Sequence, residues 1–224
     1  MDAISRSPMV VETTSNPPRY TPKNLSIADR NMMTAEVINK YVNEKIPFIL
    51  NNLSRIPEEG VKELQEKGID LYSLQRMFLD VFEMAFGEID RTDLSESNLL
   101  KIAEIAKKCC FGTCLEMVAV GTKFAHEKNV KVEPFCISGG NHTFLVLGRD
   151  PKSDPSNFDK WGSSAAVCDP WSGENFPAHE IPKKLENYLV ATWGDNYEKP
   201  ITKTEPFDPE KHTLMFLKDF HQTV

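Results

Sequence analysis

The feature that most constrains the fold is a change in the spacing of apolar residues near residue 110. Before this point apolar residues recur at helical spacing, which predicts helices over residues 27–46, 71–89 and 97–110. After it, a helix over residues 114–129 precedes short apolar runs bounded by Gly, Pro and Asn, which are typical of strands. Helices followed by one central helix and an antiparallel sheet predict an α+β domain.

The same patterns divide the chain into three parts. Residues 1–24 combine prolines with Ser, Thr and Asn, and we expect them to form a disordered or loosely docked arm. We expect residues 25–110 to form the helical N-terminal part of the domain and residues 111–224 to form its α+β core. The elements expected in that core are strands over 130–137, 142–149 and 165–169, a helix near 181–192 and an apolar run at 214–217.

Composition excludes several classes of function. The 26 basic and 33 acidic side chains give a net charge of −7, and no basic stretch stands out, so we expect no nucleic-acid partner. No segment approaches the roughly 18 apolar residues of a membrane helix, and the N-terminus has no secretory signal. The five cysteines, an odd number, fit a reducing compartment. We therefore expect a cytoplasmic protein, with export into a host cell without a cleavable leader as the alternative.

The segment FGTCLEM, residues 111–117, predicts the start of a helix that carries a reactive cysteine. Gly112 permits a sharp turn, and Thr113 and Glu116 have the spacing of a capping box. With Thr113 as the N-cap, Cys114 is the first helical residue, where unpaired N–H groups and the helix dipole favour a thiolate. The same N–H groups can stabilise an oxyanion on a substrate. Glu116 is interpreted as a cap rather than as a catalytic group.

Two further polar residues stand at the ends of predicted strands. A Gly-Gly turn delivers His142 as the first residue of an apolar strand, near the rim of the sheet. Asp169 ends the strand 165–169, where Pro170 stops it. An acid at such a buried position needs a partner, and an imidazole N–H on the neighbouring strand supplies one. Taken singly, the histidine could be structural and the acid could cap an Asp-Pro turn.

The spacing of these residues links them to one another. His142 follows Cys114 by 28 residues, and Asp169 follows His142 by 27. A nucleophile that opens a helix, a histidine that begins a strand and an acid that ends the next have the order found in the papain and transglutaminase superfamily. The segments GTCLEMVAV, GNHTFLVLG and VCDPWSG resemble the Cys, His and Asp motifs of papain-like and transglutaminase-like enzymes, including effectors that bacteria deliver into host cells.

The resemblance implies a papain-like or transglutaminase-like core with Cys114 as nucleophile, His142 as base and Asp169 as orienting acid. It implies acyl transfer through a thioester, a protein substrate (a host protein if the chain is exported) and no cofactor. The glutamine that supplies an oxyanion donor ahead of the papain cysteine is absent, and Asn98 is a candidate substitute. The third residue is an acid rather than the papain asparagine. Both departures favour a transglutaminase or deamidase, with a papain-like cysteine protease as the alternative.

Three other interpretations remain open. The first is a metal site, although zinc ligands usually occur in closely spaced pairs. The second is a non-catalytic protein-binding module of the same fold, with residues 25–110 as its recognition surface. The third places the nucleophile at Cys109 or Cys110, where the negative end of a helix dipole opposes a thiolate. The residues that a metal site would gather are Cys110, Cys114, Cys136, His142 and Cys168.

Overall fold

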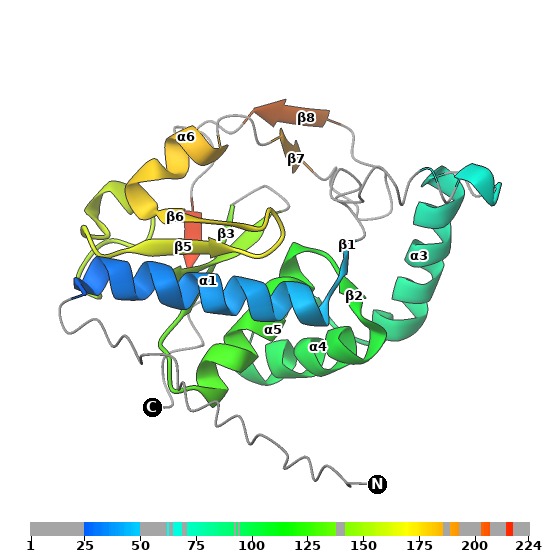
Figure 1. Ribbon diagram of the computed structural model, residues 1–224, viewed down its shortest axis with the longest axis horizontal. Helices are drawn as coiled ribbons and strands as arrows, with labels where there is room; N and C mark the ends of the chain where they lie inside the picture. Colours follow the sequence, from blue (N-terminus) through cyan, green and yellow to red (C-terminus); the bar gives the residue numbers. More distant parts are fainter. Residues whose placement is uncertain are drawn as a thin grey trace, which may run out of the picture.

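A five-stranded antiparallel sheet with helices on its two faces organises the molecule (Figure 1). The computed structural model describes residues 25–49, 62, 65–68, 71–91, 93, 95–137, 142–185, 189–192, 203–206 and 214–216. The predicted arm over residues 1–24 and the Gly-Gly turn before His142 lie outside these ranges. The prediction of an α+β fold is confirmed.

The strands follow the order β6-β5-β4-β3-β9, and each pairs with its neighbours in antiparallel fashion. Four of them lie within the predicted strand ranges and the predicted apolar run. The exception is β6, which carries polar residues and a proline and buries only Phe176. The bounds are Glu133–Ile137 for β3, Thr143–Leu147 for β4, Ala166–Asp169 for β5, Glu174–Pro177 for β6 and Leu214–Phe216 for β9.

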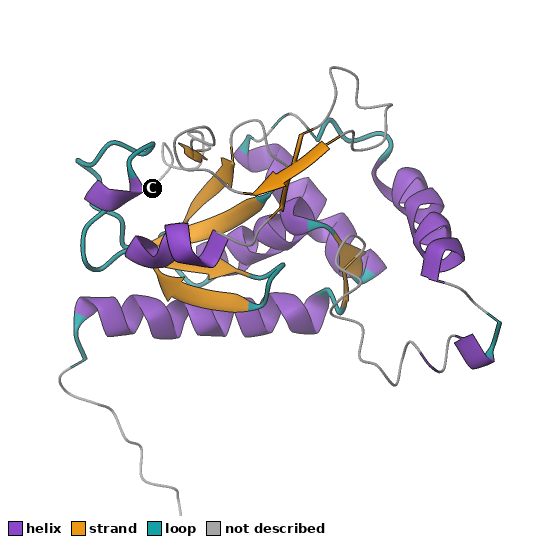
Figure 2. Ribbon diagram, turned by 90° about the horizontal axis from the view of Figure 1, so that it is seen from above, coloured by secondary structure: helices purple, strands orange, loops and turns teal. Residues whose placement is uncertain are grey.

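Two helices, α1 (Ile27–Lys45) and α5 (Cys114–Glu127), pack side by side on one face of the sheet. Figure 2 shows the long helix α1 lying along the strands nearest to it, β5 and β6. The packing is tight at Gly121 of α5, where a Cβ atom would lie 2.7 Å from Leu145 Cδ1 and 3.2 Å from Ile38 Cγ2. The absence of a side chain at this position therefore lets α5 settle between the sheet and α1.

The helix α1 begins and ends where the sequence predicts. Ser26 is its N-cap and accepts a hydrogen bond from the Asp29 N–H, and the helix ends at Lys45, before Pro47. Its buried face carries Ala35, Ile38, Asn39 and Val42. The first helix of the N-terminal part is therefore built directly into the core beside α5.

Two further helices extend this layer. The helix α4 (Glu96–Cys109) packs against α5, and α3 (Leu71–Phe86) packs against α4. At the end of α3, the rings of Phe82 and Phe86 pack in a tilted arrangement at a centroid distance of 4.6 Å, and both lie near Phe111. Within the described segments, no helix has both the length and the apolar character needed to cross a membrane.

The opposite face of the sheet is covered by a second apolar cluster. Phe135 of β3 packs against the fully buried ring of Trp161, at a centroid distance of 4.5 Å. The short helix α6 (Ile181–Leu185) buries Ile181 and Leu185 in the same cluster and lies opposite α1 in Figure 1. Two 3-10 helices, η2 (Phe158–Lys160) and η3 (Ala178–Glu180), complete this cover.

The remaining strands form two small sheets. Strand β1 (Phe48–Ile49) runs parallel to β2 (Phe111–Gly112), so the end of α1 is tied to the segment that leads into α5. Strand β7 (Leu189–Thr192) pairs with β8 (Lys203–Pro206). The prediction of a helix near 181–192 is correct only for Ile181–Leu185 and wrong for residues 189–192. Their antiparallel pairing with β8, the next strand along the chain, decides their conformation.

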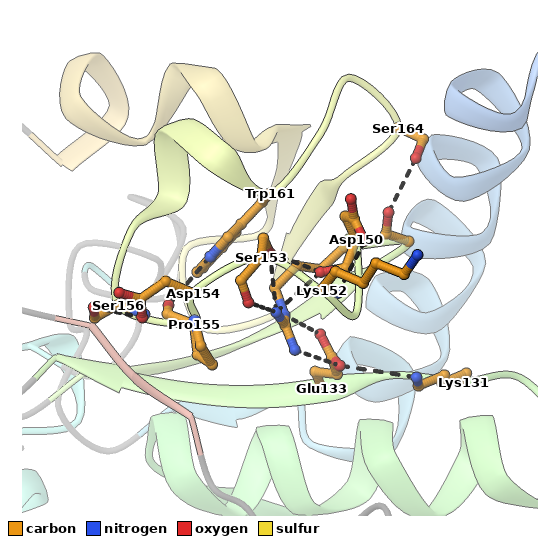
Figure 3. A network of polar contacts seen from close by, with 12 residues as sticks. Lys131, Glu133, Asp150, Lys152, Ser153, Asp154, Pro155, Ser156, Trp161 and Ser164 are labelled. Atoms are coloured by element: carbon orange, nitrogen blue, oxygen red, sulfur yellow. Dashed lines mark hydrogen bonds and ion pairs between the residues drawn. The ribbon is translucent and has the colours of Figure 1, made fainter.

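A buried ion pair closes the sheet at the start of β3 and the end of β4 (Figure 3). Arg149 Nε donates to Glu133 Oε2 at 2.7 Å, and a second guanidinium nitrogen donates to Glu133 Oε1 at 3.1 Å. Arg149 Nη1 also donates to the carbonyl and hydroxyl oxygens of Ser153. This network fixes the loop after β4 at the end of the sheet opposite to His142.

Candidate active site

Cys114 is the first residue of α5, with Thr113 as its N-cap. The predicted capping box is present: the Thr113 N–H donates to Glu116 Oε2 at 2.8 Å, and the Thr113 hydroxyl donates to the same oxygen at 2.6 Å. The Cys114 side chain is only 6% exposed. The thiol therefore occupies the positive end of a helix dipole in a largely water-excluded position.

Glu116 also receives a partner that the sequence pattern does not reveal. Arg91 donates from Nε and Nη2 to Glu116 Oε1 at 3.1 and 2.9 Å, and from Nη2 to the Thr113 hydroxyl at 3.2 Å. The guanidinium lies 4.7 Å above the Phe82 ring. The carboxylate is completely buried and thus fully engaged in holding the start of α5. These contacts support the interpretation of Glu116 as a cap.

Gly112 is required for close packing rather than for a left-handed turn. Its φ angle is not positive, and a Cβ atom at this position would lie 2.6 Å from Glu116 Cβ. A side chain here would displace the capping carboxylate and, with it, the first turn of α5. The Gly-Thr-Cys sequence thus serves the geometry of the helix start.

His142 and Asp169 form a buried contact on the other side of the site. His142 Nε2 lies 2.8 Å from Asp169 Oδ2, and the two residues are 1% and 4% exposed. The second oxygen, Oδ1, accepts the N–H groups of Trp171 at 3.1 Å and Ser172 at 3.2 Å. The carboxylate is therefore held by its own turn on one side and by the imidazole on the other.

The sheet register explains why two residues 27 positions apart meet. Strands β4 and β5 are antiparallel, with Leu145 opposite Cys168, so the start of β4 lies beside the end of β5. His142 stands just ahead of β4, and its carbonyl accepts the Ile137 N–H at 3.0 Å. The Trp171 ring meets the imidazole edge-on at a centroid distance of 5.2 Å. The expected adjacency of His142 and Asp169 is present in the structure.

The surroundings of His142 favour its charged form. Burial by itself lowers the pKa of the ring, but the charge and hydrogen bond of Asp169, followed by the hydrogen bond and charge of Cys114, raise the pKa of His142 to about 10. Nε2 faces Asp169, and the interaction with Cys114 acts on the same ring. The three predicted site residues are thus brought together in the order Cys114, His142, Asp169.

The other cysteines have different environments. Burial raises the pKa of the Cys109 thiol, and burial followed by the charge of Cys114 raises that of Cys136 to about 11. Burial also raises the pKa of Cys168, which packs in the core and donates to the Ala35 carbonyl. Cys110 is exposed and caps the end of α4. Cys109 and Cys110 lie at the end of α4, as the sequence predicts.

Two polar side chains near the site have roles that the sequence did not indicate. Both amide hydrogens of Asn98 are directed away to the Asp90 and Asp93 carbonyls, each at 2.7 Å, so this side chain serves the loop before α4. The hydroxyl of Thr143 is buried next to His142 and has no hydrogen-bond partner among the described residues. Asn98 is therefore not in a position to replace the missing glutamine as an oxyanion donor.

No cluster of three or more His, Cys, Asp or Glu side chains that could hold a metal ion occurs in the described segments of the chain. A scan of protein-family models and searches of curated proteins and of solved structures found no match to this chain. The resemblance to papain-like and transglutaminase-like enzymes therefore stays a prediction, carried by the three sequence segments and by the geometry of the residues within them.

Proposed function

We propose that the protein is a cysteine-dependent acyltransferase of the transglutaminase or deamidase type, acting on a carboxamide of a protein substrate. The observation that carries the proposal is the buried 2.8 Å contact between His142 Nε2 and Asp169 Oδ2, with Cys114 beside the same imidazole at the start of α5. A central helix packed on an antiparallel sheet is compatible with a papain-like or transglutaminase-like core.

The chemistry proceeds in two steps. The Cys114 thiolate attacks the carboxamide carbon while His142 carries a proton on Nδ1. As the tetrahedral intermediate collapses, the C–N bond breaks, His142 protonates the departing nitrogen, and ammonia leaves a thioester behind. Neutral His142 then removes a proton from an amine or a water molecule, which attacks the thioester. Breaking the C–S bond gives a cross-linked amide or a carboxylate and restores the thiolate.

The electrostatics of the site support this assignment. A carboxylate as the third residue, within a buried and weakly screened contact, holds a positive charge on His142 that a neutral asparagine would not hold. The proton needed by the leaving ammonia is then already in place. Cys114 begins α5, so the N–H groups in the first turn of this helix can donate to the negative oxygen of the tetrahedral intermediate.

The proposal is tested by amine incorporation. The protein is incubated in a cell lysate with a fluorescent primary amine, and labelled proteins are counted on gels while released ammonia is measured. We expect incorporation or ammonia release with the wild type and a fall of roughly 10³-fold or more in Cys114→Ala. The matched control is Cys110→Ala, which removes an exposed thiol only four residues away and should leave the activity intact.

The products separate the alternatives. New protein N-termini without ammonia release would assign the site to peptide-bond cleavage, the reaction of a papain-like cysteine protease. Activity that persists undiminished in Cys114→Ala would refute the proposed nucleophile. Stoichiometric zinc in protein purified without a chelating resin would favour the metal interpretation instead.

A further inference from the structure

Two asparagines one helical turn apart on α1, Asn39 and Asn43, contact the turn that carries the acid of the site. Asn39 Nδ2 lies 3.4 Å from the Asp169 carbonyl oxygen and 3.2 Å from the Glu174 carbonyl oxygen. It also lies 3.1 Å from Asn175 Oδ1. All the acceptors of this amide therefore belong to one short segment, residues 169–175.

Asn43 fixes the direction of the Asn39 amide. Asn43 Nδ2 donates to Asn39 Oδ1 at 2.6 Å, which leaves the Asn39 amino group facing the turn. The same Nδ2 atom lies 3.2 Å from the Pro170 carbonyl oxygen. The pair thus binds the carbonyl groups of two consecutive residues, Asp169 and Pro170, at the point where β5 ends.

The position of Asn39 is unusual for a polar side chain. It is 5% exposed and stands on the apolar face of α1, with Ile38 and Val42 as buried neighbours. A buried amide at such a place costs free energy unless its hydrogen bonds are made, and an apolar residue would pack there without that cost. The hydrogen bonds to the 169–175 turn compensate for this free-energy cost.

We infer that Asn39 and Asn43 are positioning residues for the acid of the candidate site. They hold the backbone of the turn, and the turn orients the Asp169 carboxylate. Oδ1 accepts hydrogen bonds from the N–H groups of Trp171 and Ser172, which leaves Oδ2 to contact His142. The inference rests on the proposed function and extends the site to α1, about 75 residues ahead of the nucleophile along the chain.

The same helix offers a matched control. Asn31 Nδ2 donates to the Ser164 carbonyl at 2.8 Å, so it also ties α1 to a loop of the sheet by an amide-to-carbonyl hydrogen bond. Its partner precedes β5, whereas the partners of Asn39 are the last residue of β5 and two residues of β6. Loss of Asn31 removes a comparable contact without touching the turn of Asp169.

The test compares Asn39→Ala, Asn43→Ala and Asn31→Ala by two readouts. The first is the titration of the His142 imidazole followed by ¹⁵N NMR and assigned with His142→Gln. The second is the rate of Cys114 alkylation at neutral pH, located by peptide mapping. We expect Asn39→Ala to move the His142 titration to lower pH and to slow alkylation by roughly ten- to a hundredfold. Asn43→Ala acts in the same direction, and Asn31→Ala leaves both readouts as in the wild type.

The inference is overturned if Asn39→Ala and Asn43→Ala titrate like the wild type and lower only the melting temperature, as Asn31→Ala does. Should Asn39→Ala fail to fold, the milder Asn43→Ala decides the question by the same two readouts. The His142 titration needs no turnover. A failure of the proposed function, seen as activity that survives Cys114→Ala, is therefore distinguishable from a failure of this inference.

Discussion

The two carboxylate oxygens of Asp169 have separate partners, and this division orients one of them toward His142. One oxygen is held by backbone N–H groups of its own turn, and the other lies against His142. Because both side chains are buried, the negative charge is weakly screened and acts on the imidazole at short range. The third member, Cys114, stands at the start of a helix and interacts electrostatically with the same ring.

The substitution Asp169→Asn tests this arrangement because it removes one negative charge. We expect Asp169→Asn to move the His142 titration to lower pH, because the charge that raises the pKa of the ring is lost. Activity should fall roughly 10²- to 10⁴-fold. The measurement is ¹⁵N NMR of the imidazole together with the amine-incorporation assay. The exposed Asp159→Asn serves as control, and an unchanged titration in Asp169→Asn would contradict the assignment.

The buried hydroxyl of Thr143 gives a second prediction for a single residue. Because this hydroxyl has no hydrogen-bond partner in the part of the chain that the structure describes, the isosteric substitution Thr143→Val removes a desolvated polar group without opening a cavity. We expect the free energy of unfolding in urea to rise by about 1 kcal/mol. A loss of stability in this variant would mean that the hydroxyl makes a favourable contact in solution.

At the scale of elements, several polar contacts hold the start of α5 in place. The Glu116 carboxylate closes the capping box with Thr113 and pairs with Arg91, and Gly112 makes room for it. Since Cys114 stands between the two capping residues, the same contacts that begin the helix also fix the nucleophile. The stability of the helix start and the reactivity of Cys114 therefore depend on the same contacts.

The substitution Glu116→Ala measures this coupling. It leaves the Thr113 N–H and the Arg91 guanidinium without their buried acceptor, and we expect it to lower the free energy of unfolding by about 2–4 kcal/mol. Alkylation of Cys114 should slow at the same time. Glu127→Ala, at the exposed end of the same helix, should change stability by about 0.5 kcal/mol or less. Equal effects of the two substitutions would contradict the account of the helix start.

Local signals in the sequence explain which elements were predictable. The capping boxes at Ser26 and Thr113 lie within four consecutive residues, and both helices begin where these signals place them. Strand β6 was missed because it carries polar residues, a proline and a single buried apolar side chain, although it pairs with β5 in a hairpin. Residues 189–192 were assigned to a helix because their pairing with residues 203–206 leaves no local signal. Within the site, the contacts also differ in how far the sequence predicts them. The contact between His142 and Asp169 follows from the order of strands, whereas Asn39 meets a turn 130 residues away and has no local signal.

At the scale of the whole molecule, stability should depend on pH through His142. The folded pKa of about 10 lies above the ordinary value near 6.5 of an unfolded histidine. A group whose pKa is raised by folding contributes stability that is complete below pH 6.5 or so and is lost as the pH rises through about 10. Urea unfolding at a series of pH values should show this decline in the wild type. In Asp169→Asn the decline should be much shallower, and an equally steep decline would contradict the prediction.

The central claim is that Cys114 is an activated nucleophile paired with His142, and the pH dependence of its alkylation tests it most directly. Iodoacetamide is added at limiting concentration with glutathione in the same tube, and the two rates are measured by mass spectrometry. Between about pH 6 and 8 the glutathione rate rises roughly tenfold per pH unit, as for an ordinary thiol below its pKa. We predict a Cys114 rate that stays nearly constant over this range and that becomes pH-dependent in His142→Gln. A Cys114 rate that rises in parallel with glutathione in the wild type would contradict the claim.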